Sequence, residues 1–463
     1  MRYLQTLIVV CCTFLSLAAF AEDSLTVFKA GDRVKADEMN ANFKTLADAI
    51  EEANEALADA VSFEGMEDVY GGLSDEEEEA SNFLERATAD VVPCSESDTS
   101  CVINGNRASV VCSAGETGKL KSVLESPYAN AAFLLVEIQG ECVEDNLLIT
   151  RGAAFFSKDR SAKASITAST DTAATCIGHY CYFGNINVNG RLTAGRGASL
   201  ILQENMTITD ITTDTDWSPA IYAGEGAFLM FGSNLDVDGN IFAEGGASLA
   251  LYGAGNTFSQ NLTLKGAEFV ASGGGFKAAR MSALEGARIQ LKNGTFEIDA
   301  VAVSSGSNLS LWHMPQVPGG LTTNYITVSD GSHLRAEMYN GFDMTGAADG
   351  SFPDPGVLYI WDSSTAYFGY GGNVKLRGVQ IASGSLLRLA PVAGVPFEVD
   401  GLGLGYGSQI TSNNSSFANI VVKKTLSADT NSFIQYGAVD ASQATLDISK
   451  GCASLGLQGD LCE

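Results

Sequence analysis

Positive charge is scarce in this sequence. Against 55 Asp and Glu residues there are only 27 Lys and Arg residues and three histidines, and the net charge is −28. Nucleic-acid binding relies on Lys and Arg to neutralise phosphates, so this balance argues against a nucleic-acid partner and against docking on anionic lipid. It is typical of a protein that works in a salty exterior, where the mutual repulsion of its charges is screened.

Long apolar runs are equally rare, and the one that exists opens the sequence. Arg2 precedes the run YLQTLIVVCCTFLSLAAFA, which ends in Ala19-Phe20-Ala21. A basic residue, a short apolar stretch and an Ala-x-Ala ending predict a secretory signal peptide over residues 1–21. No later run is long enough to cross a bilayer, so we expect no membrane span. We therefore expect a secreted protein that is extracellular or periplasmic; its bacterial origin is an expectation that rests on the resemblances given below.

Cysteine is absent from the long stretch between Cys181 and Cys452. Of the ten cysteines, two (Cys11 and Cys12) lie in the apolar run, which leaves an even number, eight. In an exported chain this predicts disulfides. A metal site is disfavoured, because there are only three histidines and no Cys-x-x-Cys pair. Proximity along the chain favours the pairs Cys94–Cys101, Cys112–Cys142, Cys176–Cys181 and Cys452–Cys462.

A heptad pattern occupies residues 36–61. Apolar residues recur there at alternating spacings of four and three, which predicts a helix with an apolar seam. The seam consists of Met39, Phe43, Leu46, Ile50, Ala53, Leu57 and Ala60. The stretch FKAGDRVKADEMNANF at its start resembles an N-terminal element found before coiled-coil stalks in exported, fibre-like bacterial proteins.

We therefore expect a short helical stalk over residues 22–62 that joins copies of the chain into a homo-oligomer, with a trimer as the favoured state. Packing of the same helix against its own domain is the alternative. Residues 63–106, which include the acidic run SDEEEEASNFLERA, are expected to form an acidic linker and a Cys loop.

Glycine returns at regular intervals along the rest of the chain. Gly246, Gly266, Gly286 and Gly306 stand twenty residues apart, and each begins the pattern Gly-small-x-apolar. Ala or Ser follows every glycine of the set, and the third residue on is always apolar. The set is Gly152, Gly197, Gly226, Gly246, Gly266, Gly286, Gly306, Gly331, Gly384 and Gly407. The segments 362–371 and 441–448 are expected to be degenerate copies.

Each repeat predicts one strand with an apolar inner side, because the third and fifth residues of an extended segment point the same way. Glycine allows the backbone turn that precedes the strand, and the small residue lets neighbouring turns stack closely. Strands that recur in this manner form a β-solenoid with one continuous core.

The start of the repeated region carries further signals. ASVVCSAGETGKLKSVLESP contains a strand and a short helical stretch near Lys119–Leu124, and VEIQGEC and DNLLITRG follow it. These segments resemble the start of right-handed parallel β-helix proteins of the pectin-lyase-like fold. The resemblance implies that the helix caps the first coil and that Cys112 and Cys142 staple it, and it carries no activity. We predict an all-β, right-handed parallel β-helix over residues 107–450, with a C-terminal disulfide clip over residues 451–463.

Catalytic motifs known from β-helix enzymes are missing. The Gly-His-Gly and Arg-Ile-Lys motifs of galacturonase-like hydrolases do not occur, and WDSS at Trp361 lacks the histidine of the pectate-lyase motif. We assign no catalytic residue and no cofactor. Asp210, Asp214 and Asp216 are candidate calcium ligands, with a solvated polar loop as the favoured alternative.

Exposed aromatic rings commonly stack on sugars. The candidate glycan contacts are Trp312, Trp361, Tyr367 and Tyr370, and coverage of coil corners is the alternative. We expect a secreted or cell-surface, non-catalytic structural or adhesive protein, with a polysaccharide as the candidate ligand. A polysaccharide lyase or glycoside hydrolase on the same scaffold is the alternative function, and a lyase base would then lie near Lys277, Arg280 or Arg335.

Overall fold

The computed structural model divides the chain between residues 90 and 91, and all described residues belong to the second unit, residues 91–463. It describes residues 92–93, 101–104, 106–113, 115–126, 132–159, 161–211, 218–314, 319–338, 342–344, 356–370, 374–391, 397–412, 420–429, 431–435 and 439–448. The predicted signal peptide, helical stalk and C-terminal clip lie outside the described residues, together with most of the acidic linker.

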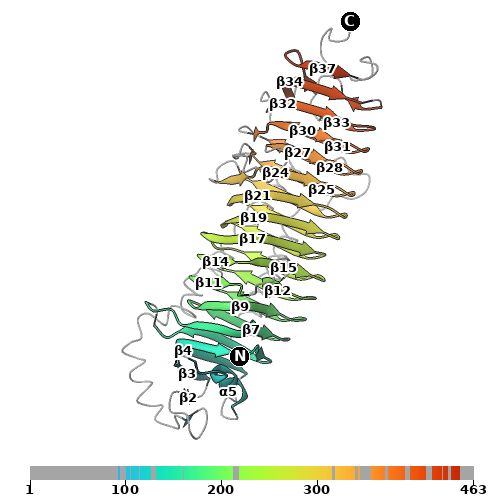
Figure 1. The fold of residues 1–463 in the computed structure, drawn as a ribbon. Coiled ribbons are helices and arrows are strands. Elements are labelled where there is room, and N and C mark those ends of the chain that lie inside the picture. Colours follow the sequence, from blue (N-terminus) through green and yellow to red (C-terminus); the bar gives the residue numbers. More distant parts are fainter. Residues whose placement is uncertain are drawn as a thin grey trace, which may run out of the picture. The chain divides into compact units, whose positions relative to one another are not determined.

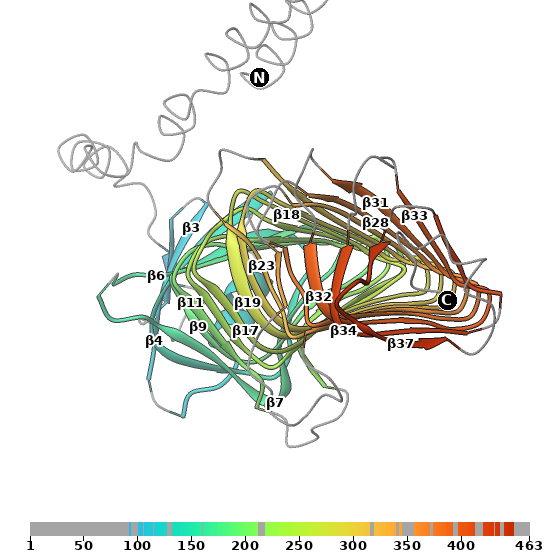
Figure 2. The same cartoon turned by 90° about the horizontal axis from the view of Figure 1, so that it is seen from above.

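The second unit is an all-β parallel solenoid, as the repeat predicted (Figure 1). Each turn of chain gives one strand to sheet A and one or two strands to sheet B. In sheet A, β16 (Ser248–Leu251) pairs in parallel with β18 (Glu268–Ser272), which pairs in parallel with β20 (Arg288–Lys292). In sheet B, β19 (Gly275–Leu284) pairs in parallel with both β17 (Asn256–Lys265) and β21 (Thr295–Val303). Figure 2 shows the successive turns from above.

The two sheets run through the described part of the solenoid. Besides β16, β18 and β20, sheet A contains β3 (Arg107–Cys112), the first half of β4 (Phe133–Glu144), β6 (Gly152–Ser157), β8 (Tyr180–Gly184), β10 (Ser199–Leu202), β13 (Phe228–Phe231), β22 (Asn308–His313), β25 (His333–Met338), β28 (Thr365–Tyr370), β31 (Leu386–Pro391), β33 (Gln409–Ser412) and β35 (Phe433–Ile434).

Besides β17, β19 and β21, sheet B contains the second half of β4, β5 (Leu147–Ile149), β7 (Ser165–Cys176), β9 (Asn187–Ala194), β11 (Met206–Thr209), β12 (Pro219–Ala223), β14 (Leu235–Asp238), β15 (Asn240–Glu244), β23 (Gly320–Thr322), β24 (Tyr325–Val328), β26 (Phe342–Asp343), β27 (Val357–Ile360), β29 (Val374–Lys375), β30 (Gly378–Ile381), β32 (Phe397–Leu404), β34 (Ile420–Ala428), β36 (Val439–Asp440) and β37 (Thr445–Ile448).

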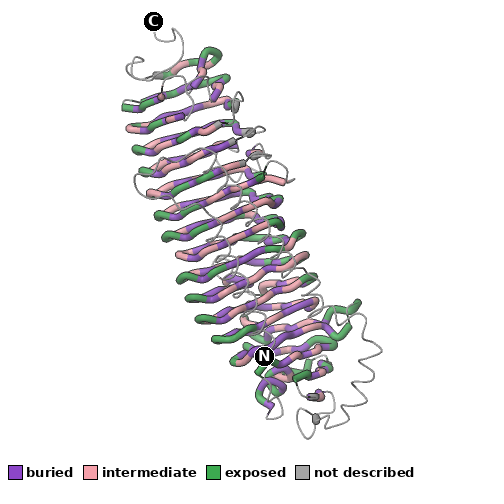
Figure 3. Tube along the Cα trace, turned by 180° about the vertical axis from the view of Figure 1, so that it is seen from behind, coloured by how far each residue is buried: buried purple, intermediate pink, exposed green. Residues whose placement is uncertain are grey.

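The apolar residues of the repeat form one column inside the solenoid. Leu229, Leu249, Phe269, Ile289 and Leu309 are register partners in successive sheet A strands, and each is at most 2% exposed. Figure 3 shows the resulting alternation of buried and more exposed residues along the strands. Burial of this column is the main source of stability that the repeat supplies.

All of the repeated glycines except Gly152, which begins β6, lie at the corners that lead into sheet A. Gly286, for example, has a φ of 80°, a region that favours glycine. The next residue is fully buried, and where it is Ser its hydroxyl has a partner. The Ser307 N–H donates to the Ser332 hydroxyl at 3.1 Å, and the Ser332 N–H donates to the Ser364 hydroxyl at 3.1 Å. The first six repeats have Ala at this position and the last four have Ser, so the corner residue is small throughout and the Ser hydroxyls are hydrogen-bonded.

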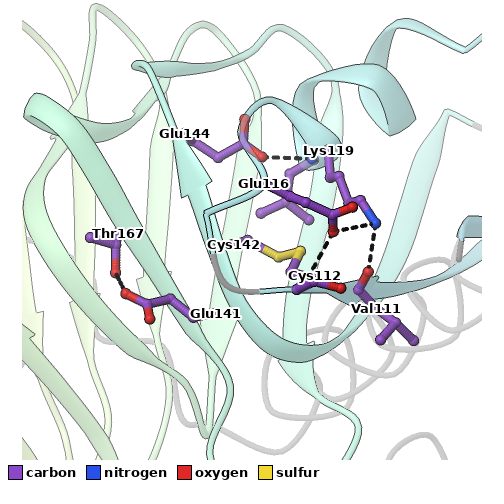
Figure 4. The surroundings of a disulfide bond; sticks show 10 residues. Val111, Cys112, Glu116, Lys119, Glu141, Cys142, Glu144 and Thr167 are labelled. Carbon is purple, nitrogen blue, oxygen red and sulfur yellow. Dashed lines mark hydrogen bonds and ion pairs between the residues drawn. A yellow bond between two sulfur atoms is a disulfide. The ribbon is translucent and has the colours of Figure 1, made fainter.

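Helix α5 (Lys119–Glu125) lies at the N-terminal coil, as the resemblance implied. Leu120, Val123 and Leu124 of this helix are buried. The Glu144 carboxylate, on β4, accepts a hydrogen bond of 2.7 Å from the Leu120 N–H (Figure 4). Residues 101–104, expected in the Cys loop, form β2 (Cys101–Asn104), which pairs antiparallel with β3 and with β1 (Val92–Pro93).

Two of the predicted disulfides are present. Cys112–Cys142 joins β3 to β4 with a Cα–Cα distance of 5.1 Å, and Cys176–Cys181 joins the end of β7 to β8 with a Cα–Cα distance of 6.1 Å. Cys101 is also disulfide-bonded. Cys94, Cys452 and Cys462 lie outside the described residues, so the two pairs that contain them stay predictions.

Candidate functional site

The outer side of sheet A presents its polar and aromatic residues in rows. Side chains alternate along a strand, so every second residue faces away from the core. On β22 the outward residues include Ser310 and Trp312, and on β25 their register partners are Arg335 and Glu337. On β20 the corresponding residues are Gln290 and Lys292. Three neighbouring strands thus place these side chains side by side.

A depression of about 330 Å³ lies among these residues. Its lining consists of Gln290, Lys292, Ser310, Leu311, Trp312, Arg335 and Glu337. Apart from Leu311, these are the outward residues of β20, β22 and β25. The combination of one indole ring with amide, hydroxyl and charged groups is suited to a ligand that has both an apolar face and hydroxyl groups.

Arg335 joins this depression to the next strand. Its guanidinium nitrogens Nε and Nη2 lie 2.9 Å and 2.5 Å from Oε1 of Glu337, and its Cζ atom lies 5.8 Å from the centroid of the Tyr367 ring on β28. The hydrogen bond to the Glu337 carboxylate raises the pKa of Arg335 above its ordinary value. Because the Arg335 side chain is 66% exposed, the ion pair orients the guanidinium more than it stabilises the fold.

We call the outward residues of β20, β22, β25, β28 and β31 the sheet A site. Among those that the structure describes, Arg288, Lys292, Arg335 and Arg388 carry positive charge, and Glu337 is the only carboxylate. This balance is opposite to that of the whole chain, whose net charge is −28. Four cations therefore lie close together on this part of sheet A, beside one carboxylate.

The predicted aromatic contacts divide between the two sheets. Trp312 and Tyr367 belong to the sheet A site. Trp361 follows the sheet B strand β27, and its ring lies 5.3 Å from that of Tyr359, which lies 5.3 Å from that of Tyr325. Tyr370 ends β28, and its side chain lies outside the described residues. The four rings predicted from sequence therefore do not form one surface.

Other sequence candidates lie elsewhere. Lys277 and Arg280 are on β19 of sheet B, and the Lys277 ammonium is 2.6 Å from the Glu297 carboxylate. Asp210 follows β11, whereas Asp214 and Asp216 lie outside the described residues. In the part of the chain that the structure describes, no three His, Cys, Asp or Glu side chains are grouped to hold a metal ion.

Sequence reasoning missed Gln290, Lys292, Ser310 and Glu337. Each of them stands two or four residues after the first residue of its strand, which is Arg288, Asn308 or His333. Residue types at these outward positions vary from one turn to the next. One signal in the sequence could have found them. Along the chain, the outward position two residues after the strand start changes from apolar residues such as Met230 and Val270 to charged residues such as Arg335 and Arg388.

No protein-family model, curated protein or solved structure matches this chain. None of the helices in the described residues is long and apolar enough to cross a membrane.

Proposed function

We propose that the protein is a secreted or cell-surface, non-catalytic structural or adhesive solenoid that binds a polysaccharide at the sheet A site. The observation that carries the proposal is the arrangement of Trp312 and Tyr367 on one outer face, with Arg335 and Glu337 between them. Two strand spacings separate the rings' strands, which is roughly 10 Å. Sugar rings can stack on both aromatic faces while the charged groups between them bind hydroxyls.

The proposal excludes catalysis for a chemical reason. Glycoside cleavage uses two carboxyl groups roughly 5 to 10 Å apart. Among the described outward residues of the sheet A site, Glu337 is the only carboxylate, and Arg335 engages it. A lyase needs a deprotonated base, and the Glu337 carboxylate raises the pKa of Arg335, which keeps this guanidinium protonated and unable to accept a proton. These features support binding over turnover.

Matched aromatic variants test the proposal. Trp312→Ala and Tyr367→Ala each remove a ring from the sheet A site, and Trp361→Ala removes a ring from sheet B as a control. Loss of one stacking ring is worth about 0.5–1.5 kcal/mol, so we expect each of the first two variants to weaken polysaccharide binding roughly twofold to tenfold. Trp361→Ala should bind like wild type. Weakening by Trp361→Ala alone would contradict the assignment of the site.

The proposal also includes two features that the described residues do not test. The stalk seam of Met39, Phe43, Leu46, Ile50 and Leu57 would join copies of the chain, which would multiply the number of sheet A sites per particle and raise avidity. The coils would wind in the right-handed sense of the pectin-lyase-like fold. Light scattering on the mature chain tests the first feature, and an experimental structure tests the second.

A further inference from the structure

The outer side of sheet A changes character along the solenoid. In its N-terminal part, the middle outward position is apolar on seven successive strands. The last of these, β18, also carries the charged outward residue Glu268, so the first six strands form the nearly uncharged part of the row. The register partners on these six strands are Leu135, Ala154, Tyr182, Ile201, Met230 and Ala250, on β4, β6, β8, β10, β13 and β16. Ala154 and Ala250 are only 2% and 6% exposed, so the exposed apolar area of this row comes mainly from the four larger side chains. We call the outward residues of these six strands the apolar half of sheet A.

Flanking rings extend this row. Phe133, Tyr180 and Tyr252 are 41%, 62% and 61% exposed, and the rings of Phe156 and Tyr182 pack with centroids 5.0 Å apart. All six strands are fully described, and Glu137 is the only charged residue at their outward sheet A positions. Monomeric proteins rarely leave a continuous apolar surface of this size in water.

We propose that the apolar half of sheet A is an interface with a second copy of this chain. The first argument is charge. The chain carries a net charge of −28, so two copies repel one another over most of their surfaces. The apolar half of sheet A carries almost no charge, so two copies can approach there without bringing like charges together, and contact removes apolar side chains from water.

The second argument is area. Six strands about 4.8 Å apart, each presenting about five residues with a rise of about 3.3 Å, cover roughly 500 Å² of flat face per copy. Two such faces packed together bury roughly 1,000 Å², which is the lower limit for a specific interface. Sheets pack face to face about 10 Å apart through facing side chains that are mostly apolar, as these are, with exceptions that include Glu137, Ser199 and Ser248.

The third argument concerns a glycan as the alternative occupant. A glycan needs hydrogen-bond partners for its hydroxyls, and of the six residues in the central row only Tyr182 has a side chain that can form a hydrogen bond. The surface is therefore better suited to the apolar side chains of another protein. It is separate from the sheet A site, which begins at β20, so the inference does not depend on the proposed function.

A charge placed in the middle of this surface tests the inference in the full mature chain. Met230→Glu and Met230→Lys each introduce an outward charge on β13. Thr411→Glu and Thr411→Lys introduce the same charges at an outward position of the same sheet on β33, as matched controls. Multi-angle light scattering would measure the mass of each variant, and circular dichroism would confirm that each is folded.

We expect both Met230 variants to lower the mass of the wild-type particle twofold, and both Thr411 variants to keep it. Disruption by either sign of charge would show that burial, rather than net charge, is responsible. A monomeric wild type, or an oligomer that neither Met230 variant changes, would overturn the inference. Loss of polysaccharide binding by the Met230 variants at unchanged mass would overturn it too, and would assign the surface to a glycan.

Discussion

Glu144 offers a test of how the first coil is closed, because its carboxylate is buried against the capping helix. The side chain is 1% exposed and accepts a hydrogen bond from the Leu120 N–H at 2.7 Å. Burial raises the pKa of Glu144 above its ordinary value of 4.5, and the hydrogen bonds from the N–H groups of Leu120 and Lys121 only partly oppose this effect. The Glu144 carboxylate thus accepts a hydrogen bond that the buried Leu120 N–H needs, while burial makes its ionised form less favourable.

The stability that depends on Glu144 should fall as pH rises. Below pH 4.5 the group is protonated in both the folded and the unfolded chain, so its charge costs nothing. Between pH 4.5 and the raised pKa of the folded state, Glu144 is ionised in the unfolded chain and protonated in the folded chain. The free energy of unfolding therefore falls by roughly 1.4 kcal/mol for each pH unit in this window. Above the folded pKa the loss is complete and constant.

Two substitutions separate the charge from the acceptor. Glu144→Gln keeps a carbonyl oxygen for the Leu120 N–H and removes the charge, so it should match wild type at pH 4 and be at least as stable at pH 7.5. Glu144→Ala leaves a buried N–H without an acceptor and should cost about 1–3 kcal/mol at both pH values. Glu141→Gln is the matched control on the same strand, because Glu141 is exposed and bonds to the Thr167 hydroxyl at 2.9 Å.

Hydrogen exchange of the peptide that covers α5 is the suitable assay, since the end of a solenoid can open without the rest. We expect faster exchange in Glu144→Ala only. If Glu144→Gln exchanged faster than wild type at pH 7.5 and equally at pH 4, the carboxylate charge would be stabilising, and the reasoning from burial would be refuted.

Three further predictions concern the coils, and each is measured by thermal or denaturant unfolding. Replacing Cys112 and Cys142 by Ala should cost about 4 kcal/mol, against about 2 kcal/mol for Cys176 and Cys181, because the sequence separations are 30 and 5 residues; equal losses would contradict the loop-entropy argument. Ser363→Gly should stabilise by up to about 1 kcal/mol, since Ser363 has a φ of 60°, and a loss of stability would show that its side chain is needed. Leu309→Ala, in the buried column, should cost about 2–5 kcal/mol, and a neutral result would argue against a packed core at β22.

The inner half of the repeat was predictable because physics constrains it twice. The corner needs a backbone conformation that glycine adopts readily, and the buried column needs an apolar residue three positions later. Gly286 and Ile289 therefore predict the strand β20. The degenerate copy at residues 362–371 is confirmed as β28, where Ser363 takes the corner position that glycine holds elsewhere.

Two repeats were harder to place. The coil between Gly152 and Gly197 enters sheet A at β8, where Cys181 takes the apolar position and pairs with Leu200. The prediction that residues 441–448 are a degenerate copy of the sheet A repeat is wrong, because their strand β37 pairs with β34 in sheet B. The short β35 holds the sheet A position instead, and Asn431, with a φ of 67°, precedes it at the corner.

The outer side was less predictable, because side chains in water are not constrained by the core. Whether two outward residues meet depends on the length of each intervening coil, which varies along this chain. Trp312 and Tyr367 are far apart in sequence yet share a face, whereas Trp361, six residues before Tyr367, belongs with Tyr359 beside sheet B. Sequence could identify these rings as candidates and could not assign them to one surface.

The most direct test of the proposed function is one assay that reads binding and cleavage together. A panel of acidic and neutral polysaccharides would be incubated with the mature protein. Retention on each polysaccharide would be measured alongside the appearance of new reducing or unsaturated ends. We predict that at least one polysaccharide is retained, that Trp312→Ala weakens this retention, and that no new ends form. Cleavage of any member of the panel at an enzyme-like rate would contradict the account.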